Sequence, residues 1–286
     1  MLEELLDLER VLDVPLPVSG GARNFDAVND IITRSGDDAG LDVPDGSSVI
    51  LQVLVKPEDA ATSSTIAGKK NSTGVASAAG YQLRIVGGSS YAWSVSDSVD
   101  QDSKGSTTVP SNGVWKSVTG VLKANAAADD DNYIYVETTQ ENSVTGLTLL
   151  GSLENARPFR VGANSNSTPA GFFDGDIAYA RVWIKGSAWT QAEIDQVIQA
   201  HNRLYLPAGW GPSTMRLQWV LWDAGSPSTT LDLSGNGLTG TYTDTTAVSD
   251  PARVMGPGGS PVRLRHTAPV AATTNPGWYV SRGGWF

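Results

Sequence analysis

The feature that most constrains the fold lies at residues 159–201, where a short strand, a polar loop, a longer strand and a capped helix follow one another directly. The longer strand has apolar residues on both of its alternating faces, which is typical of a strand covered on both sides. One predicted face carries Ile177, Tyr179, Arg181 and Trp183, and the other carries Ala178, Ala180, Val182 and Ile184.

A capping signal follows this strand. Thr190 precedes Glu193 by three residues, the spacing at which the two side chains satisfy each other's free backbone N–H groups at a helix start. Trp189, just before the cap, is expected to pack as a hydrophobic staple. The apolar positions then recur at helical spacing and predict one buried helix face, formed by Ile194, Val197, Ile198 and His201.

Clusters of turn residues recur along the chain from residue 22 to residue 151. Short strand patterns alternate with clusters such as Pro44-Asp45-Gly46 and Ser111-Asn112-Gly113, a spacing that indicates a β-sandwich. The 31 glycines and 15 prolines of the chain agree with an all-β protein that has many turns.

Several segments resemble strands of the laminin-G-like, concanavalin A-type jelly rolls, and they occur in the same order. The stretch F-F-D-G-D-I, with the T-x-x-E helix after it, resembles the C-terminal signature of these domains. Upstream, the resemblance is carried by NFD (24–26), VILQVLVKP (49–57), GYQL (80–83), WKSV (115–118) and YIYV (133–136). The resemblance implies an all-β antiparallel sandwich over residues 22–203. It does not select a function, because this fold occurs in lectins, hydrolases and adhesion modules alike.

We expect four segments in the chain: an N-terminal docking helix (1–18), the jelly roll (19–206), a strand pair (207–250) and an extended basic arm (251–286). The strand pair contains LDLSGNG, a sequence that resembles text found before the first strand of laminin-G-like domains. The pair either folds back to complete the same sandwich or lies outside it, against itself or a neighbouring copy. We favour the first arrangement, because an unpaired sheet edge is an aggregation hazard.

The two ends of the chain are predicted to dock on something. A helix of about twelve residues is too short to be stable alone in water, so the N-terminal one must pack on its own domain or on a neighbouring subunit. The last 36 residues hold arginine and aromatic side chains and no acidic residue, and such side chains often anchor interfaces. The predicted assembly interface consists of Leu5, Leu8, Arg263, Arg265, Trp278, Arg282, Trp285 and Phe286.

Composition excludes several classes of protein. The net charge of −10 argues against a nucleic-acid partner, since phosphate backbones are bound by clustered lysine and arginine. The absence of cysteine rules out disulfides and thiolate chemistry and suits folding in a reducing cytoplasm. No apolar run is long enough to span a membrane, and the acidic start of the chain does not resemble a secretory signal.

The sequence does not predict catalysis. Glucanases of this fold use an E-x-D-x-x-E strand motif whose carboxylates act as nucleophile and acid, and Glu137 and Glu141 have no partners at that spacing. The histidines, His201 and His266, are not accompanied by a recognisable nucleophile and carboxylate. His201 is expected to pack with both ring nitrogens satisfied.

Two binding sites remain as hypotheses. The acidic run Asp129, Asp130 and Asp131 offers hard oxygen ligands for calcium, although a solvated acidic loop is the favoured explanation for it; no other cofactor is predicted. Sugars stack on exposed aromatic rings beside polar loops, so the candidate carbohydrate-binding residues are Tyr91, Trp93, Asn164 and Asn166, with Trp115 also considered. Tyr91 and Trp93 share a strand face with Val95, and core packing is the favoured explanation for them.

These observations predict a non-enzymatic structural protein of a tailed-phage virion that displays a lectin-like domain on the capsid surface or tail. A virion protein is made in the host cytoplasm without a signal peptide and later faces the outside. Its partners would be other virion subunits, copies of itself and cell-surface glycans, which many weak contacts could hold together. The alternatives are a carbohydrate-binding module or adhesin of a bacterial surface and, third, a glycan-active enzyme.

Overall fold

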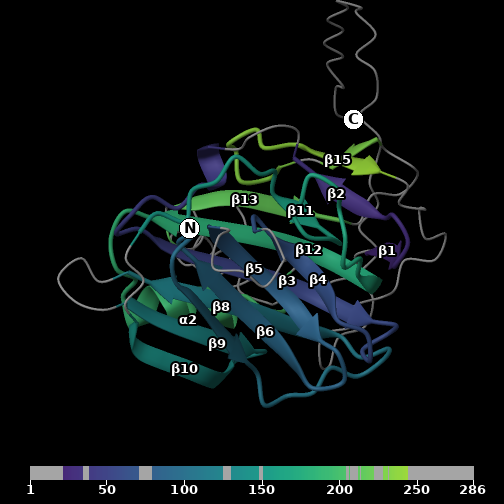
Figure 1. Cartoon of the computed structure of the whole chain (residues 1–286), viewed down its shortest axis with the longest axis horizontal. Helices are drawn as coiled ribbons and strands as arrows, with labels where there is room; N and C mark the ends of the chain where they lie inside the picture. Colours follow the sequence, from purple (N-terminus) through teal and green to yellow (C-terminus); the bar gives the residue numbers. More distant parts are fainter. Residues whose placement is uncertain are drawn as a thin grey trace, which may run out of the picture.

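The computed structural model is a sandwich of two antiparallel β-sheets with a single α-helix among its described residues (Figure 1). It describes residues 22–34, 39–70, 79–124, 130–147, 151–203, 206, 212, 214–221, 228–230 and 232–243. The predicted N-terminal helix and C-terminal arm, with all the residues of the predicted assembly interface, lie outside this part of the chain, as do Asp129 and His266. The fold class predicted from the sequence is confirmed.

The first sheet has seven strands, and its two longest are the neighbours β12 and β3. Its order is β1 (Arg23–Asp26), β12 (Asp174–Lys185), β3 (Ser48–Pro57), β8 (Lys116–Lys123), β9 (Asp130–Val136) and β10 (Thr139–Leu147), and β13 (Met215–Val220) also pairs with β12. Strands β1 and β13 pair with successive halves of β12, so β13 extends the edge that β1 begins.

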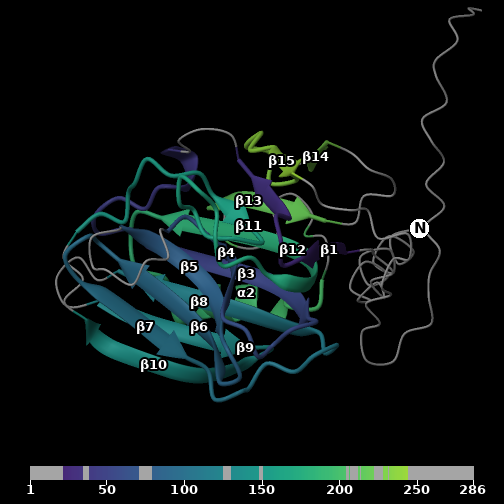
Figure 2. The same cartoon turned by 45° about the vertical axis from the view of Figure 1, so that its right-hand side comes forward.

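The second sheet has eight strands. Its order is β14 (Thr229–Thr230), β15 (Gly240–Thr243), β2 (Ile31–Thr33), β11 (Arg160–Val161), β4 (Ser64–Gly68), β5 (Gly80–Val86), β6 (Ser90–Ser96) and β7 (Gln101–Gly105). A short 3₁₀ helix, η1 (Ala39–Leu41), precedes β3. Figure 2 shows strands β4 to β7 side by side, with α2 behind them on the far side of the first sheet.

The strands β13, β14 and β15 come from the segment that the sequence left with two possible arrangements. Strand β13 pairs with β12 in the first sheet, and β15 pairs with β2 in the second. Asp232 holds the turn between them, because its carboxylate accepts hydrogen bonds from the backbone N–H groups of Gln218, Ser234 and Leu238. The segment therefore adds strands to both sheets of the same sandwich.

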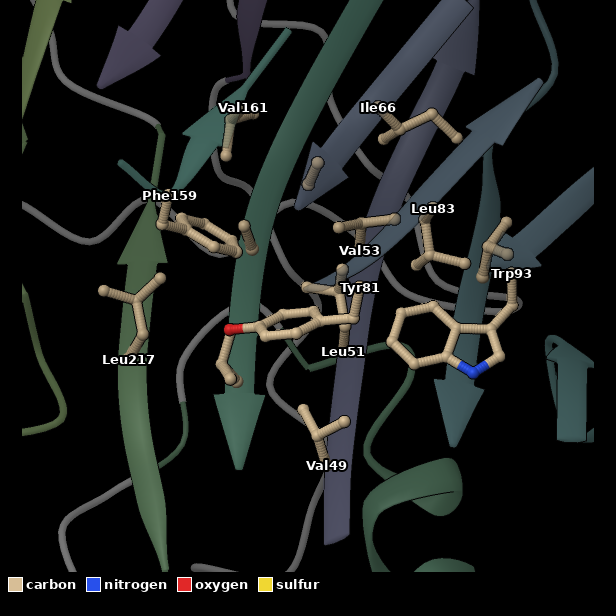
Figure 3. Packing of buried hydrophobic residues seen from close by; sticks show 14 of the residues in the cluster. Val49, Leu51, Val53, Ile66, Tyr81, Leu83, Trp93, Phe159, Val161 and Leu217 are labelled. Atoms are coloured by element: carbon tan, nitrogen blue, oxygen red, sulfur yellow. The ribbon is translucent and has the colours of Figure 1, made fainter. Parts of the chain in front are cut away.

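The core lies between the sheets and is built around aromatic rings. Trp93 lies 6.1 Å from Tyr81, and Phe159 lies 5.6 Å from Trp219, between ring centroids. Figure 3 shows three of these rings, Tyr81, Trp93 and Phe159, among the aliphatic side chains of both sheets. Gly120 on β8 makes room for the indole, since a Cβ there would lie 2.1 Å from Cδ2 of Trp93.

One register shift changes the predicted faces of β12. The pairing of β12 with β3 skips a residue between Ile177 and Tyr179, so Ala178 forms a bulge that reverses the alternation. Ile177 therefore lies in the core between the sheets with Ala180 and Val182, rather than with Tyr179 on the outer face. The predicted burial of both faces is nevertheless found.

Helix α2 (Gln191–Gln199) begins at the predicted capping box. Thr190 Oγ1 accepts from the backbone N–H of Glu193, and the Glu193 carboxylate accepts from the backbone N–H of Thr190 at 2.8 Å. Trp189 and Ile194 belong to one buried cluster with Ile50 and Trp183 of the first sheet. The helix thereby covers the outer face of that sheet.

Replacing Thr190 by alanine is expected to lower the free energy of unfolding by about 0.5–2 kcal/mol, since one of the first N–H groups of the helix would lose its acceptor. Chemical denaturation of the full chain measures this change. Thr190→Asn retains a capping oxygen and should restore most of the loss; an equal loss in both variants would argue against the cap.

Candidate functional site

A row of polar residues crosses the outer face of each sheet. In the first sheet the register aligns Gln218, Arg181, Gln52 and Thr119 side by side on β13, β12, β3 and β8. In the second sheet it aligns residues of seven strands, from β15 to β7. We call this the outer polar row, and its members are Thr241, Thr33, Arg160, Gly68, Gln82, Ser94 and Ser103.

The row of the first sheet holds helix α2 in place. Arg181 donates to Gln52 Oε1 at 3.2 Å and to the backbone oxygens of Ala200 and Arg203. Gln52 donates to the carbonyl of Val197 at 3.0 Å. These groups add side-chain donors to carbonyls at and just after the C-terminal end of the helix, two of which, those of Val197 and Ala200, also accept a backbone N–H.

The outer polar row of the second sheet is satisfied far less completely. The neighbours of Gln82 and Ser94 in sequence, Leu83 and Trp93, point into the core, so by alternation these polar side chains point away from it. Gln82 is 3% exposed and its Oε1 has no hydrogen-bond partner. The same is true of Nε of Arg160, which is 8% exposed, and of Oγ1 of Thr33.

Buried polar groups are nearly always hydrogen-bonded, so the unsatisfied groups in this row call for an explanation. Gly68 contributes to this arrangement, because a Cβ there would lie 2.6 Å from Cβ of Gln82. Ser94 and Ser103 bond to each other at 2.8 Å at one end of the row. Ser103 is partly exposed, so this end is open to solvent.

Basic side chains gather at the row. Arg84 lies two residues beyond Gln82 on β5, and its Nε is also buried without a partner. Burial lowers the pKa of Arg84, and burial together with the nearby charge of Arg157 lowers the pKa of Arg160. Burial and the charge of Arg84 lower the pKa of Lys70 to about 8. Each of these causes penalises the charged form of a base.

The loop after β11 is fixed beside the row. Asn164 is 1% exposed, and its Oδ1 accepts from the backbone N–H groups of Asn166 and Ala170, each at 3.2 Å. Arg160 Nη1 donates to the carbonyls of Asn164 and Asn166. The amide Oδ1 of Asn166 is buried without a partner. Of the predicted carbohydrate-binding residues, Asn166 is the one whose unsatisfied group lies next to the row.

The prediction that Tyr91 and Trp93 form an exposed sugar platform is wrong. Both side chains are 0% exposed and belong to the core cluster with Val95. The alternation of β6 directs them inward and leaves Ala92 and Ser94 for the outer face. Trp115 is partly exposed and lies beneath Lys56, whose Nζ is 5.5 Å from the ring centroid.

The sequence could have pointed to Gln82, Arg84 and Arg160. Each lies between residues that pack in the core, in the alternating sequences Y-Q-L-R-I and F-R-V. Their outward direction could therefore have been predicted. Their alignment was not, because β5 and β11 are separated by about 80 residues of sequence and by β4 in space.

The acidic residues considered for calcium have other contacts. Asp131 lies 3.4 Å from Nζ of Lys123 and accepts from the hydroxyl of Tyr133 at 2.9 Å. Asp130 is the first residue of β9. Within the described ranges, no group of three or more histidine, cysteine or acidic side chains is placed to hold a metal ion. A calcium site that includes Asp129 stays a prediction.

The residues weighed for catalysis are engaged in structural contacts. Glu141 accepts from Thr107 and Thr108. Glu137 Oε2 lies 3.4 Å from His201 Nε2, while His201 Nδ1 lies 3.1 Å from the carbonyl of Ile198, so both ring nitrogens have partners.

A hydroxyl lies in the same region: Ser117 Oγ is 3.3 Å from the hydroxyl of Tyr179. Both nitrogens of His201 are bonded elsewhere, so the histidine is not positioned to activate this serine.

No protein-family model matches the sequence, and no curated protein sequence is significantly similar to it. Similar solved structures include a candidate carbohydrate-binding protein from Bacteroides ovatus, with 17% identity and a TM-score of 0.58, covering 84% of this chain and 63% of that one. This chain therefore spans less than two thirds of the length of that protein.

Two further structures are similar at lower scores. The CBM40 domain of the Ruminococcus gnavus IT-sialidase, bound to α2,3-sialyllactose, has 11% identity and a TM-score of 0.42, covering 60% of this chain and 98% of that one. Domains LG4-5 of the mouse laminin α1 chain have 12% identity and a TM-score of 0.40, covering 62% of this chain and 45% of that one.

In the part of the chain that the structure describes, no helix is long and apolar enough to cross a bilayer. The chain has the antiparallel jelly-roll sandwich that the laminin-G-like, concanavalin A-type resemblance implied.

Proposed function

We propose that this chain is a non-enzymatic carbohydrate-binding domain whose site is the outer polar row of the second sheet. The observation that carries the proposal is the set of buried, unsatisfied hydrogen-bonding groups on Gln82, Arg160 and Thr33. A sugar carries many hydroxyls that both donate and accept, so it can satisfy an amide oxygen, a guanidinium and a hydroxyl within one row. The shared fold with a candidate carbohydrate-binding protein supports the same function.

The spacing of the strands suits an oligosaccharide. Arg160 and Gln82 lie on β11 and β5 with β4 between them, and neighbouring strands lie about 4.8 Å apart. The backbone positions of the two residues therefore lie about 10 Å apart, which is about the length of a disaccharide. Weak binding at one such site becomes useful when several copies act together.

The expected test is a glycan array probed with the full chain and with Gln82→Leu. Because Gln82 makes no hydrogen bond to the described residues, leucine should not weaken the fold. It should reduce glycan affinity by about five- to thirteenfold, since one lost hydrogen bond is worth about 1–1.5 kcal/mol. Gln199→Leu on the exposed face of α2 is the matched control.

If Gln82→Leu leaves glycan binding unchanged, the outer polar row is not the binding site. If no glycan is bound by the wild-type chain, the proposed function itself is wrong.

The role of a virion surface protein stays a prediction. It depends on the docking helix and basic arm, which lie outside the described residues. Recovery of the chain in high copy number from purified phage particles would support it, and recovery from a bacterial surface would support the adhesin alternative.

A further inference from the structure

We infer that the outer polar row recognises a negatively charged group of the glycan, a carboxylate or a sulfate, through Arg84 and Arg160. This inference rests on the proposed function and adds the chemical class of the ligand. It is based on the ion pairing and hydrogen bonding of the arginines on this face of the second sheet.

None of Arg84, Arg157 and Arg160 forms an ion pair within the described part of the chain. This is unusual for a protein with a net charge of −10, in which acidic partners are abundant. Three lysines elsewhere in the described part of the chain are paired: Lys69 with Asp42, Lys104 with Asp102, and Lys185 with Glu193. Buried charges are ordinarily paired or hydrogen-bonded, so the buried Nε groups of Arg84 and Arg160, which have no partner, call for an explanation.

The free edges of these arginines suit an oxyanion. Arg160 uses Nη1 for the loop carbonyls, which fixes the guanidinium, while its Nε has no acceptor; Nε lies on the Nε–Nη2 edge. That edge presents two parallel N–H groups, the arrangement that binds the two oxygens of a carboxylate or sulfate. Arg84 makes no hydrogen bond to any described residue, and its Nε is buried.

Basic groups lie close together in two pairs on this face. The charge of Arg84 helps to lower the pKa of Lys70, and that of Arg157 helps to lower the pKa of Arg160, so the members of each pair repel one another. A bound anion would relieve the repulsion, which a neutral sugar would not do.

Arg84→Met is the sharpest test, because the substitution removes a charge without breaking a hydrogen bond of the fold. The probes are oligosaccharides that carry uronic or sialic acids, each paired with its carboxyl-reduced counterpart, and a sulfated oligosaccharide with its desulfated form. The full chain is expected to bind one charged class at least tenfold more tightly than its neutral counterpart. The affinity should fall as salt rises, because ions screen the attraction.

Arg84→Met should abolish this preference while the urea midpoint stays unchanged. Arg216→Met is the matched control, since Arg216 is an exposed arginine of β13 in the other sheet. Equal affinity for charged and neutral partners would overturn the inference and leave the proposed function intact. A charge preference that survives Arg84→Met would also overturn it. Failure to bind any glycan would overturn both.

Discussion

Replacing Trp93 by alanine is expected to lower the free energy of unfolding by about 3–5 kcal/mol. The indole is fully buried, contacts Tyr81 and fills the space above Gly120 on the opposite sheet. Its removal would leave a cavity that rigid strands on both sides cannot close, so the loss includes a cavity term beyond the transfer of the ring from water.

Urea denaturation of the full chain measures this change. Trp115→Ala is the matched control: its ring is partly exposed, and the loss should be clearly smaller. Trp93→Ala also separates the core role from the sugar-stacking role considered for this residue, since a core residue affects stability first. A loss below about 1 kcal/mol together with abolished glycan binding would contradict the structure.

Local signals in the sequence predicted several elements of the fold. The Thr190–Glu193 spacing predicted the start of α2, and that capping box is found. The alternation of Tyr91, Trp93 and Val95 already favoured the core, and these residues lie there. Such signals are readable because they depend on neighbours within a few positions along the chain.

The bulge at Ala178 and the outer polar row could not be predicted from such local signals. A bulge depends on which residues of β3 lie opposite β12, and the sequence of β12 gives no sign of the skipped position. The row depends on the register among seven strands, several of them distant in sequence. Register is fixed by packing across the sheet rather than by local propensity.

The two polar rows show why the same residue type has different roles on the two sheets. Arg181 and Arg84 are both arginines on outward faces of β-strands. Arg181 is 0% exposed and donates to acceptors of three different residues, whereas Arg84 donates to no described residue. The first therefore serves the fold, and the second is the arginine to which we assign the ligand.

Arg181→Met is accordingly expected to lower the free energy of unfolding by about 3–5 kcal/mol. The carbonyl of Arg203 and the amide oxygen of Gln52 would lose the donor that Arg181 supplies, and the carbonyl of Ala200 would keep only the backbone N–H of Arg203. Burial already lowers the pKa of Arg181 to about 10, so the guanidinium is held at a cost that its hydrogen bonds and its contact with Tyr179, 3.8 Å from the ring centroid, offset. A buried arginine can be replaced without loss where its partners are replaced as well; here the partners are mostly backbone and stay.

Two measurements identify this mechanism. Chemical denaturation gives the change in stability, and amide hydrogen exchange should show faster exchange across α2 and residues 200–203, because the C-terminal end of the helix loses its attachment to the sheet. Arg216→Met on the neighbouring strand should change stability by no more than about 0.5 kcal/mol. If Arg181→Met left both stability and exchange as they are in the wild-type chain, the first row could not be what holds the helix. The distinction between a structural row and a ligand-binding row would then fail as well.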